Sequence, residues 1–474
     1  MASDNVTHLS FLQIFDDCKS AAGRLRKEYV SERKNRLTRL RKWIHDNRKE
    51  IHKALYADFQ KPSPEVDATE IFPTLNEIKV ALNEMDQWTA PKKVDAPLFM
   101  LGTRSYIQFE PKGVCLIIAP WNYPFNLAVG PLVSALAAGN TVVLKPSEQT
   151  PHVSALIKKM STDIFDPDIV SVCEGGVEVS QSLLVLPFDH IFFTGSPAVG
   201  KIVMKAAAEN LTSVTLELGG KSPAIVTESA NIQDAAERIA VGKFINNGQT
   251  CIAPDYILVD DKIAGPFVSS LIEKTKLLFS EEGNFETSGS YGRIVNTDHF
   301  DRIQGLTWEA ISLGAKIELD GKVDKESKFI PPVILTNVPK SSRIMNEEVF
   351  GPVLPIITYQ HLEEAIEYIN KKPKPLALYI FTGQKHVKQK VLIETSSGTV
   401  CVNDCSIQFL HHNLPFGGVN NSGIGKSHGH AGFQSFSNEK AVLKQKNGFT
   451  SAKIFYPPYT RRSNQLMDWF LKFF

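Results

Sequence analysis

The spacing of hydrophobic and polar residues predicts that the chain begins with helices. Up to about residue 90, apolar residues recur every three or four positions, which is the spacing of amphipathic helices. In the first of these segments the apolar face consists of Leu12, Phe15, Cys18, Ala22 and Leu25. Prolines and a glycine then interrupt residues 91–109, and residues 103–109 alternate in the manner of an antiparallel strand. We therefore expect residues 91–109 to leave the body of the first domain.

From residue 113 onward, strands and helices alternate. Residues 114–119 form an unbroken apolar run, as expected for a strand buried on both faces. Further strands of this first unit are expected at 141–144, 169–173, 191–193 and 213–216. A second unit begins near residue 222, with strands expected at 224–226, 256–259, 316–319, 353–357, 376–381 and 398–402. Such alternation implies right-handed crossovers, parallel sheets and ligands at the carboxyl ends of the strands.

The end of the chain is a separate amphipathic segment. Pro457-Pro458 interrupts the chain, and Ser463 is a candidate cap for a final helix. One face of that helix would carry Leu466, Trp469, Phe470, Phe473 and Phe474. The face is too short to span a membrane, which leaves two roles for it. It would cover the mouth of a pocket, on its own or a partner subunit, or lie on a bilayer surface.

The composition of the 474-residue chain is that of an ordinary globular protein, with 43% hydrophobic and 22% charged residues. Its formal net charge of +1 gives no electrostatic basis for binding nucleic acid. Six cysteines without a Cys-x-x-Cys pair favour a reducing compartment. The first residues lack the apolar core of a secretory signal, and no run approaches the roughly 20 apolar residues of a membrane span. We therefore expect a cytoplasmic protein.

A candidate nucleophile lies in the segment Asn247-Gly248-Gln249-Thr250-Cys251, between a helix expected at 232–245 and the strand at 256–259. A cysteine in such a loop is held in place and remains accessible. Its thiolate is a strong nucleophile if the pKa is lowered or a base lies near. Polar residues and a glycine follow the ends of several predicted strands and should meet at one edge of the sheet: Asn122, Lys145, Gly195 and Glu217.

Two glycine-rich segments match the phosphate-binding loop of nucleotide hydrolases only in part. The segment Gly195 to Lys201 is followed by Ile202, where a hydroxyl must reach Mg²⁺. The segment that ends in Lys221-Ser222 has Thr215 where the first glycine is required. Cys401, Cys405, His411 and His412 do not have the spacing of a common zinc site. We therefore expect neither ATP hydrolysis nor a bound metal.

Seven motifs together resemble those of the aldehyde dehydrogenase superfamily, from about residue 10 to 445. They are Pro120-Trp121-Asn122, Lys145-Pro146-Ser147-Glu148, Phe193-Thr194-Gly195-Ser196, Glu217-Leu218-Gly219-Gly220, Gly248-Gln249-Thr250-Cys251, Glu348-Val349-Phe350-Gly351-Pro352 and Pro415-Phe416-Gly417-Gly418. The short N-terminus, residues 122–126 and the Pro457-Pro458 tail are most similar to the class 3 branch, which includes the fatty aldehyde dehydrogenases.

This resemblance implies the aldehyde dehydrogenase fold, an α/β fold with two main domains. The doubly wound, Rossmann-like NAD(P)-binding domain would comprise residues 1–90 and 110–217, and the catalytic domain residues 218–420. A small β bridging element for oligomerisation would comprise residues 91–109 and 421–445, followed by a tail at 446–474. The resemblance also implies a homodimer in which residues 103–109 and 441–445 bridge the subunits.

The resemblance further implies oxidation of an aldehyde to an acid on Cys251. An aldehyde has no leaving group, so hydride leaves most easily from the thiohemiacetal that the sulfur would form. Asn122 and the Cys251 backbone N–H resemble the family's oxyanion hole, in which one donor is typically worth about 3 kcal/mol. Glu217 resembles the general base that activates water to hydrolyse the resulting thioester.

The expected cofactor is NAD, with NADP as an alternative. Lys145 would hydrogen-bond the adenine ribose. Glu148 would accept a hydrogen bond from the 2′-hydroxyl and repel a 2′-phosphate. Gly195 and Ser196 begin a helix and would face the pyrophosphate. The nicotinamide side would be held by Glu348 and Phe350. The resemblance adds Trp121, Gly200, Leu218 and Gly219 to the cofactor site, and Tyr123 and His411 to the substrate pocket.

The substrate suggested by the branch and the tail is a medium- to long-chain aliphatic or an aromatic aldehyde. Two alternatives stay open. One is an acylating dehydrogenase that passes the acyl group to coenzyme A, which would not need Glu217 to activate water. The other is a non-catalytic scaffold of the same fold, which would not need Cys251, Glu217 and Asn122 together.

Overall fold

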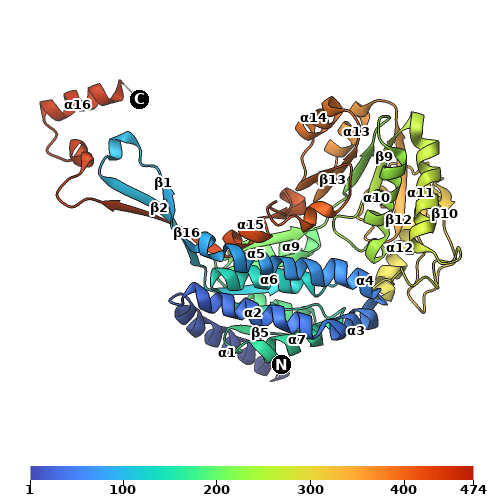
Figure 1. Cartoon of the computed structure of the whole chain (residues 1–474), viewed down its shortest axis with the longest axis horizontal. Helices are drawn as coiled ribbons and strands as arrows, with labels where there is room; N and C mark the ends of the chain where they lie inside the picture. Colours follow the sequence, from blue (N-terminus) through green and yellow to red (C-terminus); the bar gives the residue numbers. More distant parts are fainter. Residues whose placement is uncertain (1, 473–474) are drawn as a thin grey trace.

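A computed structural model describes residues 2–472 and builds them around three β-sheets (Figure 1). The first sheet has six strands in the order β15-β7-β6-β3-β4-β5. They are β3 (Val114–Ile118), β4 (Thr141–Lys145), β5 (Val170–Val172), β6 (His190–Gly195), β7 (Ser213–Leu218) and β15 (Gly423–Ile424). Neighbouring strands are parallel except β15, which is antiparallel to β7. The chain runs from β3 outward to β5 and then from β6 to β7, so the topological switch lies between β3 and β6, where such sheets bind ligands.

Helices cover both faces of the six-stranded sheet. Buried apolar residues of one face join it to α2 (Val30–Asp46), α3 (Arg48–Phe59), α5 (Phe72–Thr89), α6 (Asn126–Ala138) and α7 (Pro151–Ile164). The other face packs against α1 (Ala2–Leu25), α8 (Val177–Leu184) and α9 (Pro197–Ala208). The short α4 (Ser63–Val66) and a π-helical turn, η1 (Asp67–Ile71), lead directly into α5. The doubly wound parallel sheet predicted from the alternating pattern is thereby confirmed.

The second sheet has seven strands in the order β10-β11-β12-β9-β8-β13-β14. They are β8 (Pro223–Val226), β9 (Tyr256–Asp260), β10 (Lys316–Leu319), β11 (Val333–Thr336), β12 (Val353–Tyr359), β13 (Ala377–Phe381) and β14 (Thr399–Val402). One face packs against α10 (Ile232–Phe244) and α11 (Ala264–Phe279), and the other against α12 (Thr297–Ser312), α13 (Leu362–Asn370) and α14 (Lys385–Glu394). The 3₁₀ turns of this half are η3 (Ile245–Gly248), η4 (Asp261–Ile263), η5 (Arg343–Met345), η6 (Ile407–Leu410) and η7 (Asn420–Ser422).

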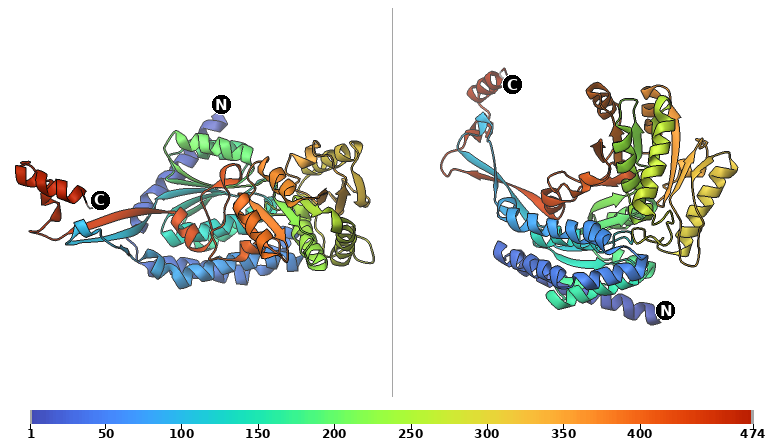
Figure 2. Two further views of the ribbon diagram at one scale, coloured as in Figure 1. Left: turned by 90° about the horizontal axis from the view of Figure 1, so that it is seen from above. Right: turned by 45° about the vertical axis from the view of Figure 1, so that its right-hand side comes forward.

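The third sheet is a three-stranded antiparallel arm that projects from the body (Figures 1 and 2). It consists of β1 (Lys92–Val94), β2 (Thr103–Pro111) and β16 (Ser437–Gln445). The strand predicted at 103–109 is therefore confirmed, and it pairs with a strand more than 300 residues later in the chain, from Thr103 opposite Gln445 to Pro111 opposite Ser437. Helix α15 (Gly429–Ser435) leads from the body into β16.

The tail helix α16 (Arg461–Leu471) lies at the far end of this arm (Figures 1 and 2). The Phe470 ring is 6.2 Å from Phe99 of η2 (Leu98–Met100) and 6.1 Å from Phe455 of η8 (Ser451–Phe455). The helix begins two residues before Ser463, because Thr460 is the cap and its hydroxyl accepts from the Ser463 N–H. Of the predicted apolar face, Phe473 and Phe474 lie outside the described residues. Within residues 2–472, no helix is long and apolar enough to cross a bilayer.

Candidate active site

Two cavities meet inside the body, between the two large sheets. The larger has a volume of about 940 Å³ and is lined from both halves of the protein. The second is a narrow cavity of about 50 Å³ on the other side of the junction. Four residues line both cavities: Thr194, Glu217, Leu218 and Cys251. The cysteine and the carboxylate predicted to act together therefore meet where the two cavities join.

A left-handed turn delivers Cys251 to this junction. Three successive residues after α10 have positive φ angles, namely Asn246 (52°), Asn247 (53°) and Gly248 (69°). Asparagine tolerates this region better than most residues. At Gly248 a side chain is excluded by space as well, because a Cβ would lie 2.3 Å from the Gly351 carbonyl oxygen. The predicted loop thus has a specific backbone shape that only a few residue types adopt.

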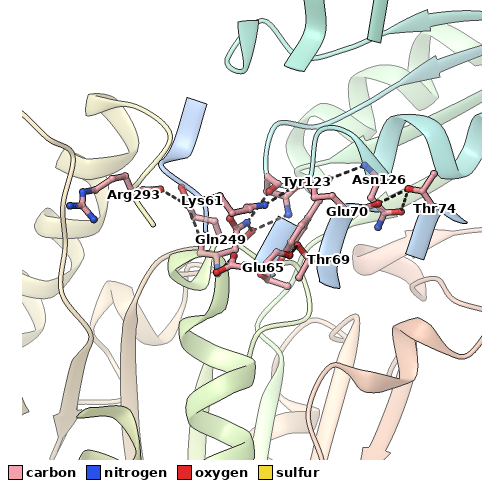
Figure 3. Close-up of polar contacts among 12 residues, drawn as sticks. Lys61, Glu65, Thr69, Glu70, Thr74, Tyr123, Asn126, Gln249 and Arg293 are labelled. Atoms are coloured by element: carbon pink, nitrogen blue, oxygen red, sulfur yellow. Dashed lines mark hydrogen bonds and ion pairs between the residues drawn. The ribbon is translucent and has the colours of Figure 1, made fainter. Parts of the chain in front are cut away.

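Side-chain hydrogen bonds hold the turn in place (Figure 3). The Gln249 amide donates to the carbonyl oxygens of Asn246 and Arg293, at 3.0 and 3.1 Å. Asn246 donates to the Asn122 carbonyl oxygen at 2.8 Å, and the Asn122 amide donates to the Gln249 carbonyl oxygen at 3.1 Å. The Asn246 N–H donates to a carboxylate oxygen of Glu65 at 3.0 Å. The amide predicted as an oxyanion donor is therefore oriented by the same turn that positions the sulfur.

A buried ion pair lies beside this turn (Figure 3). Lys61 Nζ is 2.9 Å from Glu70 Oε1, and the two side chains are 1% and 0% exposed. The second oxygen of Glu70 accepts from the Asn126 N–H at 2.9 Å, at the start of α6. Lys61 Nζ also lies 4.4 Å from the centre of the Tyr123 ring, whose hydroxyl is 2.7 Å from that of Thr250. The N-terminal helices thereby brace both the loop after β3 and the segment that ends in Cys251.

Burial shifts the protonation of the two reacting groups. Burial raises the pKa of Glu217 to about 7, although the Ser427 hydroxyl opposes this shift by donating to its Oε1 at 2.8 Å. Oε2 of Glu217 is buried and has no hydrogen-bond partner within residues 2–472. Burial, with the nearby Glu348 and Glu217, raises the pKa of the Cys251 thiol to about 12. The sulfur therefore carries its proton at neutral pH and must lose it during attack.

Most of the residues predicted to bind cofactor line the larger cavity: Trp121, Gly195, Ser196, Leu218, Gly219, Glu348 and Phe350. Ser196 caps α9 through the Val199 N–H at 3.4 Å, so the N-terminus of that helix opens at the cavity. The rings of Trp121 and Phe350 meet edge to face at 5.2 Å. A Cβ at Gly219 would lie 2.2 Å from the Glu348 carboxylate, so a side chain there would displace this carboxylate.

The other predicted residues lie outside this cavity lining. Lys145 and Glu148, at the end of β4, form an ion pair of 2.6 Å with each other. Gly200 lies in α9 against Leu218, where a Cβ would approach the leucine side chain to 2.7 Å. Neither predicted substrate contact lines the second cavity. Tyr123 turns instead toward Lys61 and Thr250, and His411 is exposed after the turn of η6.

The residues of the second cavity that the sequence did not single out include Glu77, Ser427 and His428. Glu77 on α5 accepts from the Gly429 N–H at 2.9 Å and lies 3.3 Å from His428 Nδ1. One sequence signal existed, because the spacing of apolar residues predicts an amphipathic helix at 69–88. Glu70 and Glu77 are seven residues apart and would share one face of that helix with apolar residues. Nothing in the sequence pattern links them to residues near 427.

The fold and this junction define an enzyme class, and comparison with known proteins agrees. The profile described as "Aldehyde dehydrogenase family" matches residues 6–442, so the chain belongs to that family. Enzymes of this family oxidise aldehydes with NAD or NADP. The resemblance seen in the seven motifs and the expected fold are therefore confirmed.

Individual relatives are similar along nearly the whole chain. The 4,4'-diaponeurosporen-aldehyde dehydrogenase of Staphylococcus aureus is 44% identical over 458 residues, which cover 97% of this chain and 98% of the relative. Aldehyde dehydrogenase family 3 member A2 of Pongo abelii is 40% identical, over 94% of this chain and 92% of the relative. The solved structure described as the substrate-bound state of Staphylococcus aureus AldH superposes with a TM-score of 0.92 at 44% identity, over 97% of this chain and 99% of the other.

Proposed function

We propose that this protein oxidises aldehydes to carboxylic acids through a covalent intermediate on Cys251, with Glu217 as the base that activates water. The supporting observation is that these two side chains line the junction of the two cavities. One cavity is large enough for a dinucleotide, and the narrow one admits a slender aldehyde from the opposite side. A junction of this kind lets hydride leave on one side while the acyl group stays on the other.

The residues act in a fixed order in this proposal. The Cys251 thiol gives up its proton to solvent as its sulfur bonds to the carbonyl carbon, and the Asn122 amide and the Cys251 N–H stabilise the resulting oxyanion. NAD bound in the larger cavity would supply the acceptor for the hydride, and a thioester would then be left on the Cys251 sulfur. Glu217 then takes a proton from water, the water oxygen bonds to the acyl carbon, and the carbon–sulfur bond breaks to release the acid.

The larger cavity fits a dinucleotide on three observations. It opens at the N-terminus of α9, has aromatic walls in Trp121 and Phe350, and has a glycine where a side chain would strike Glu348. Glu348 would hold the nicotinamide ribose. Lys145 and Glu148 at the end of β4 would hold the adenine ribose, with the acid favouring NAD over NADP. In this arrangement the six-stranded half holds the adenine ribose and the pyrophosphate, and the seven-stranded half supplies Glu348, Phe350 and Cys251.

The substrate side favours apolar aldehydes. Most of the narrow cavity is walled by apolar side chains: Pro73, Leu127, Pro131, Phe192, Leu376, Phe409, Leu410 and Phe416. We propose medium- to long-chain aliphatic or aromatic aldehydes as substrates, in line with relatives whose names specify 4,4'-diaponeurosporen-aldehyde and coniferyl aldehyde.

We propose a homodimer in which the arm of β2 and β16 contacts the partner. The arm projects from the body, and Leu443 of β16 and Leu101 before β2 are 52% and 60% exposed. Among residues 429–472, none lines either cavity, so α16 as described does not cover the substrate cavity of its own chain. Two roles are left for α16: it covers the substrate cavity of the partner subunit, or it contacts a lipid surface. Sedimentation with vesicles that contain anionic lipid distinguishes these two roles.

The competing function is transfer of the acyl group to coenzyme A, and the direct test covers both. Purified enzyme is assayed for NADH with octanal and NAD, with and without coenzyme A. We expect NADH formation independent of coenzyme A, and its loss in Cys251→Ala. Strict dependence on coenzyme A would establish the acylating reaction instead, and unchanged activity of Cys251→Ala would remove the nucleophile.

A further inference from the structure

Contacts around Glu217 fix the orientation of its carboxylate, and the role inferred from them rests on the proposed function. Glu217 is the second-to-last residue of β7 and is 7% exposed. A carboxylate with two equivalent oxygens could present either one to water, or rotate away from the junction. The structure shows one oxygen engaged and one free, and the group that engages the first belongs to a segment about 210 residues later.

That group is the hydroxyl of Ser427. It is 2.8 Å from Glu217 Oε1 and farther, at 3.4 Å, from the Phe416 carbonyl oxygen. That carbonyl oxygen already accepts the Ser427 N–H at 2.7 Å. The single hydroxyl proton is therefore directed to the carboxylate. Oε2 has no partner within the described chain. Both Glu217 and Ser427 line the cavity on the substrate side.

The backbone around Ser427 is held firmly. Ser427 and Phe416 form a two-way antiparallel bridge, with N–H to carbonyl distances of 2.7 and 3.2 Å. The next residue, His428, has φ 71° and ψ 136°, a conformation that non-glycine residues rarely adopt and that persists only where neighbours impose it. Glu77 of α5 imposes it here, since its carboxylate accepts from the Gly429 N–H at 2.9 Å and lies 3.3 Å from His428 Nδ1.

We propose that Ser427 is a positioning residue that selects Oε2 of Glu217 as the oxygen that takes the proton from water. The strained backbone conformation of His428, which Glu77 of α5 holds in place, sets the direction of the Ser427 hydroxyl. Ser427 touches neither substrate nor cofactor in this role. It acts through Glu217 by holding the carboxylate in one orientation and by donating to its charged form.

The charge state of Glu217 supports the same role. Burial raises the pKa of this carboxyl to about 7, and the Ser427 hydrogen bond is the largest influence that lowers it. The other titratable groups that face it are Lys426 and His428 on the same segment, with Glu77 behind His428, and Cys251 on the loop after α10. Removing the hydroxyl therefore favours the neutral acid, which cannot act as a base.

The test is the pH profile of Ser427→Ala with octanal and NAD. A hydrogen bond to a charged group changes a protonation equilibrium roughly ten- to a hundred-fold. The acid limb of the pH–rate profile, which reports the protonation of Glu217, should therefore move up by about one to two pH units. The rate near neutral pH should fall by a similar factor, with the KM for NAD unchanged. Ser427→Thr keeps the hydroxyl, so its rate near neutral pH and the position of its acid limb should match those of the wild type.

The control is Ser161→Ala, which removes a buried hydroxyl that donates to the Val170 carbonyl oxygen at 2.9 Å, away from both cavities. An acid limb that stays in place in Ser427→Ala, or one that moves equally in Ser161→Ala, would overturn the positioning role. Glu217→Gln tests the proposed function separately. If that variant kept the wild-type acid limb, Glu217 would not be the base at all, whatever Ser427 does.

Discussion

Removal of Lys61 should destabilise the protein strongly, although this side chain touches neither cavity. The variant Lys61→Met keeps the length of the side chain and deletes its charge. It leaves Glu70, which is 0% exposed, without a cation in a site where burial already raises the pKa of this carboxyl. The remaining hydrogen bonds to its carboxylate come from the backbone of Asn126 and Phe125.

The magnitude follows from the burial of the pair. Breaking a buried ion pair by deleting one partner costs about 3–5 kcal/mol, because a charge is left uncompensated. A typical domain is stable by only about 5–15 kcal/mol in total. In the variant the pKa of Glu70 is raised further in the folded state, so the folded protein binds the proton more tightly than the unfolded chain. The loss of stability should therefore be largest above the raised folded-state pKa, and it should shrink as the pH falls through that pKa toward the lower pKa of the unfolded chain.

The assay is urea denaturation at fixed protein concentration, followed by tryptophan fluorescence at neutral and at mildly acidic pH. The double variant Lys61→Met with Glu70→Gln removes both charges of this buried pair and should lose less stability than Lys61→Met alone. The matched control is Lys53→Met, which breaks the exposed pair of Lys53 with Glu50, whose side chains are 72% and 53% exposed. Exposed pairs contribute about 1 kcal/mol or less.

Two results would refute this reasoning. One is a loss in Lys61→Met no larger than that in Lys53→Met. The other is a double variant that is less stable than the single one, which would mean that the charge on Glu70 is compensated by something other than Lys61.

Four further changes have defined outcomes. Glu148→Gln should raise kcat/KM with NADP relative to NAD, and an unchanged ratio would count against a 2′-hydroxyl contact. Glu65→Leu removes the acceptor of the Asn246 N–H and should lower kcat roughly ten-fold, whereas Glu65→Gln keeps an acceptor and should retain activity. An equal loss of kcat in both variants would mean that the charge of Glu65 matters rather than its hydrogen bond to Asn246. Deletion of residues 463–474 should reduce activity on long-chain more than on short-chain aldehydes, and an equal fall would remove the tail as a selectivity element. The rate of thioester hydrolysis should decline as the pH falls through about 7, where burial places the pKa of Glu217, and a flat profile would exclude it as the base.

Much of the parallel sheets could be predicted from the sequence, because strands buried on both faces leave continuous apolar runs. Residues 114–119 were such a run, and β3 spans Val114–Ile118. The start of α6 could not be predicted in the same way. The small and apolar residues at 132–138 predict a helix only from residue 132, whereas α6 begins at Asn126 and passes through Pro131. A proline interrupts the local signal for a helix, and only packing against the sheet shows that the helix tolerates it.

For the candidate site, the sequence located the groups that follow strand ends but not the groups that hold them. Glu217 and Cys251 lie in motifs, so their approach to one junction could be expected from topology. Ser427 and Glu77 lie 210 and 140 residues from Glu217 along the chain, and their contacts depend on how α5 and the segment after β15 pack. Such contacts leave no periodic pattern, because each is set by tertiary packing rather than by local spacing.

The most direct test of the account is the mass of the protein after reaction. Glu217→Gln is mixed with octanal and NAD, quenched in acid and digested. The account predicts that one octanoyl group accumulates on the peptide that contains Cys251, accompanied by no more than about one NADH per active site, because the base for hydrolysis is missing. An unmodified protein that still turns over, or an acyl group on any other residue, would contradict it.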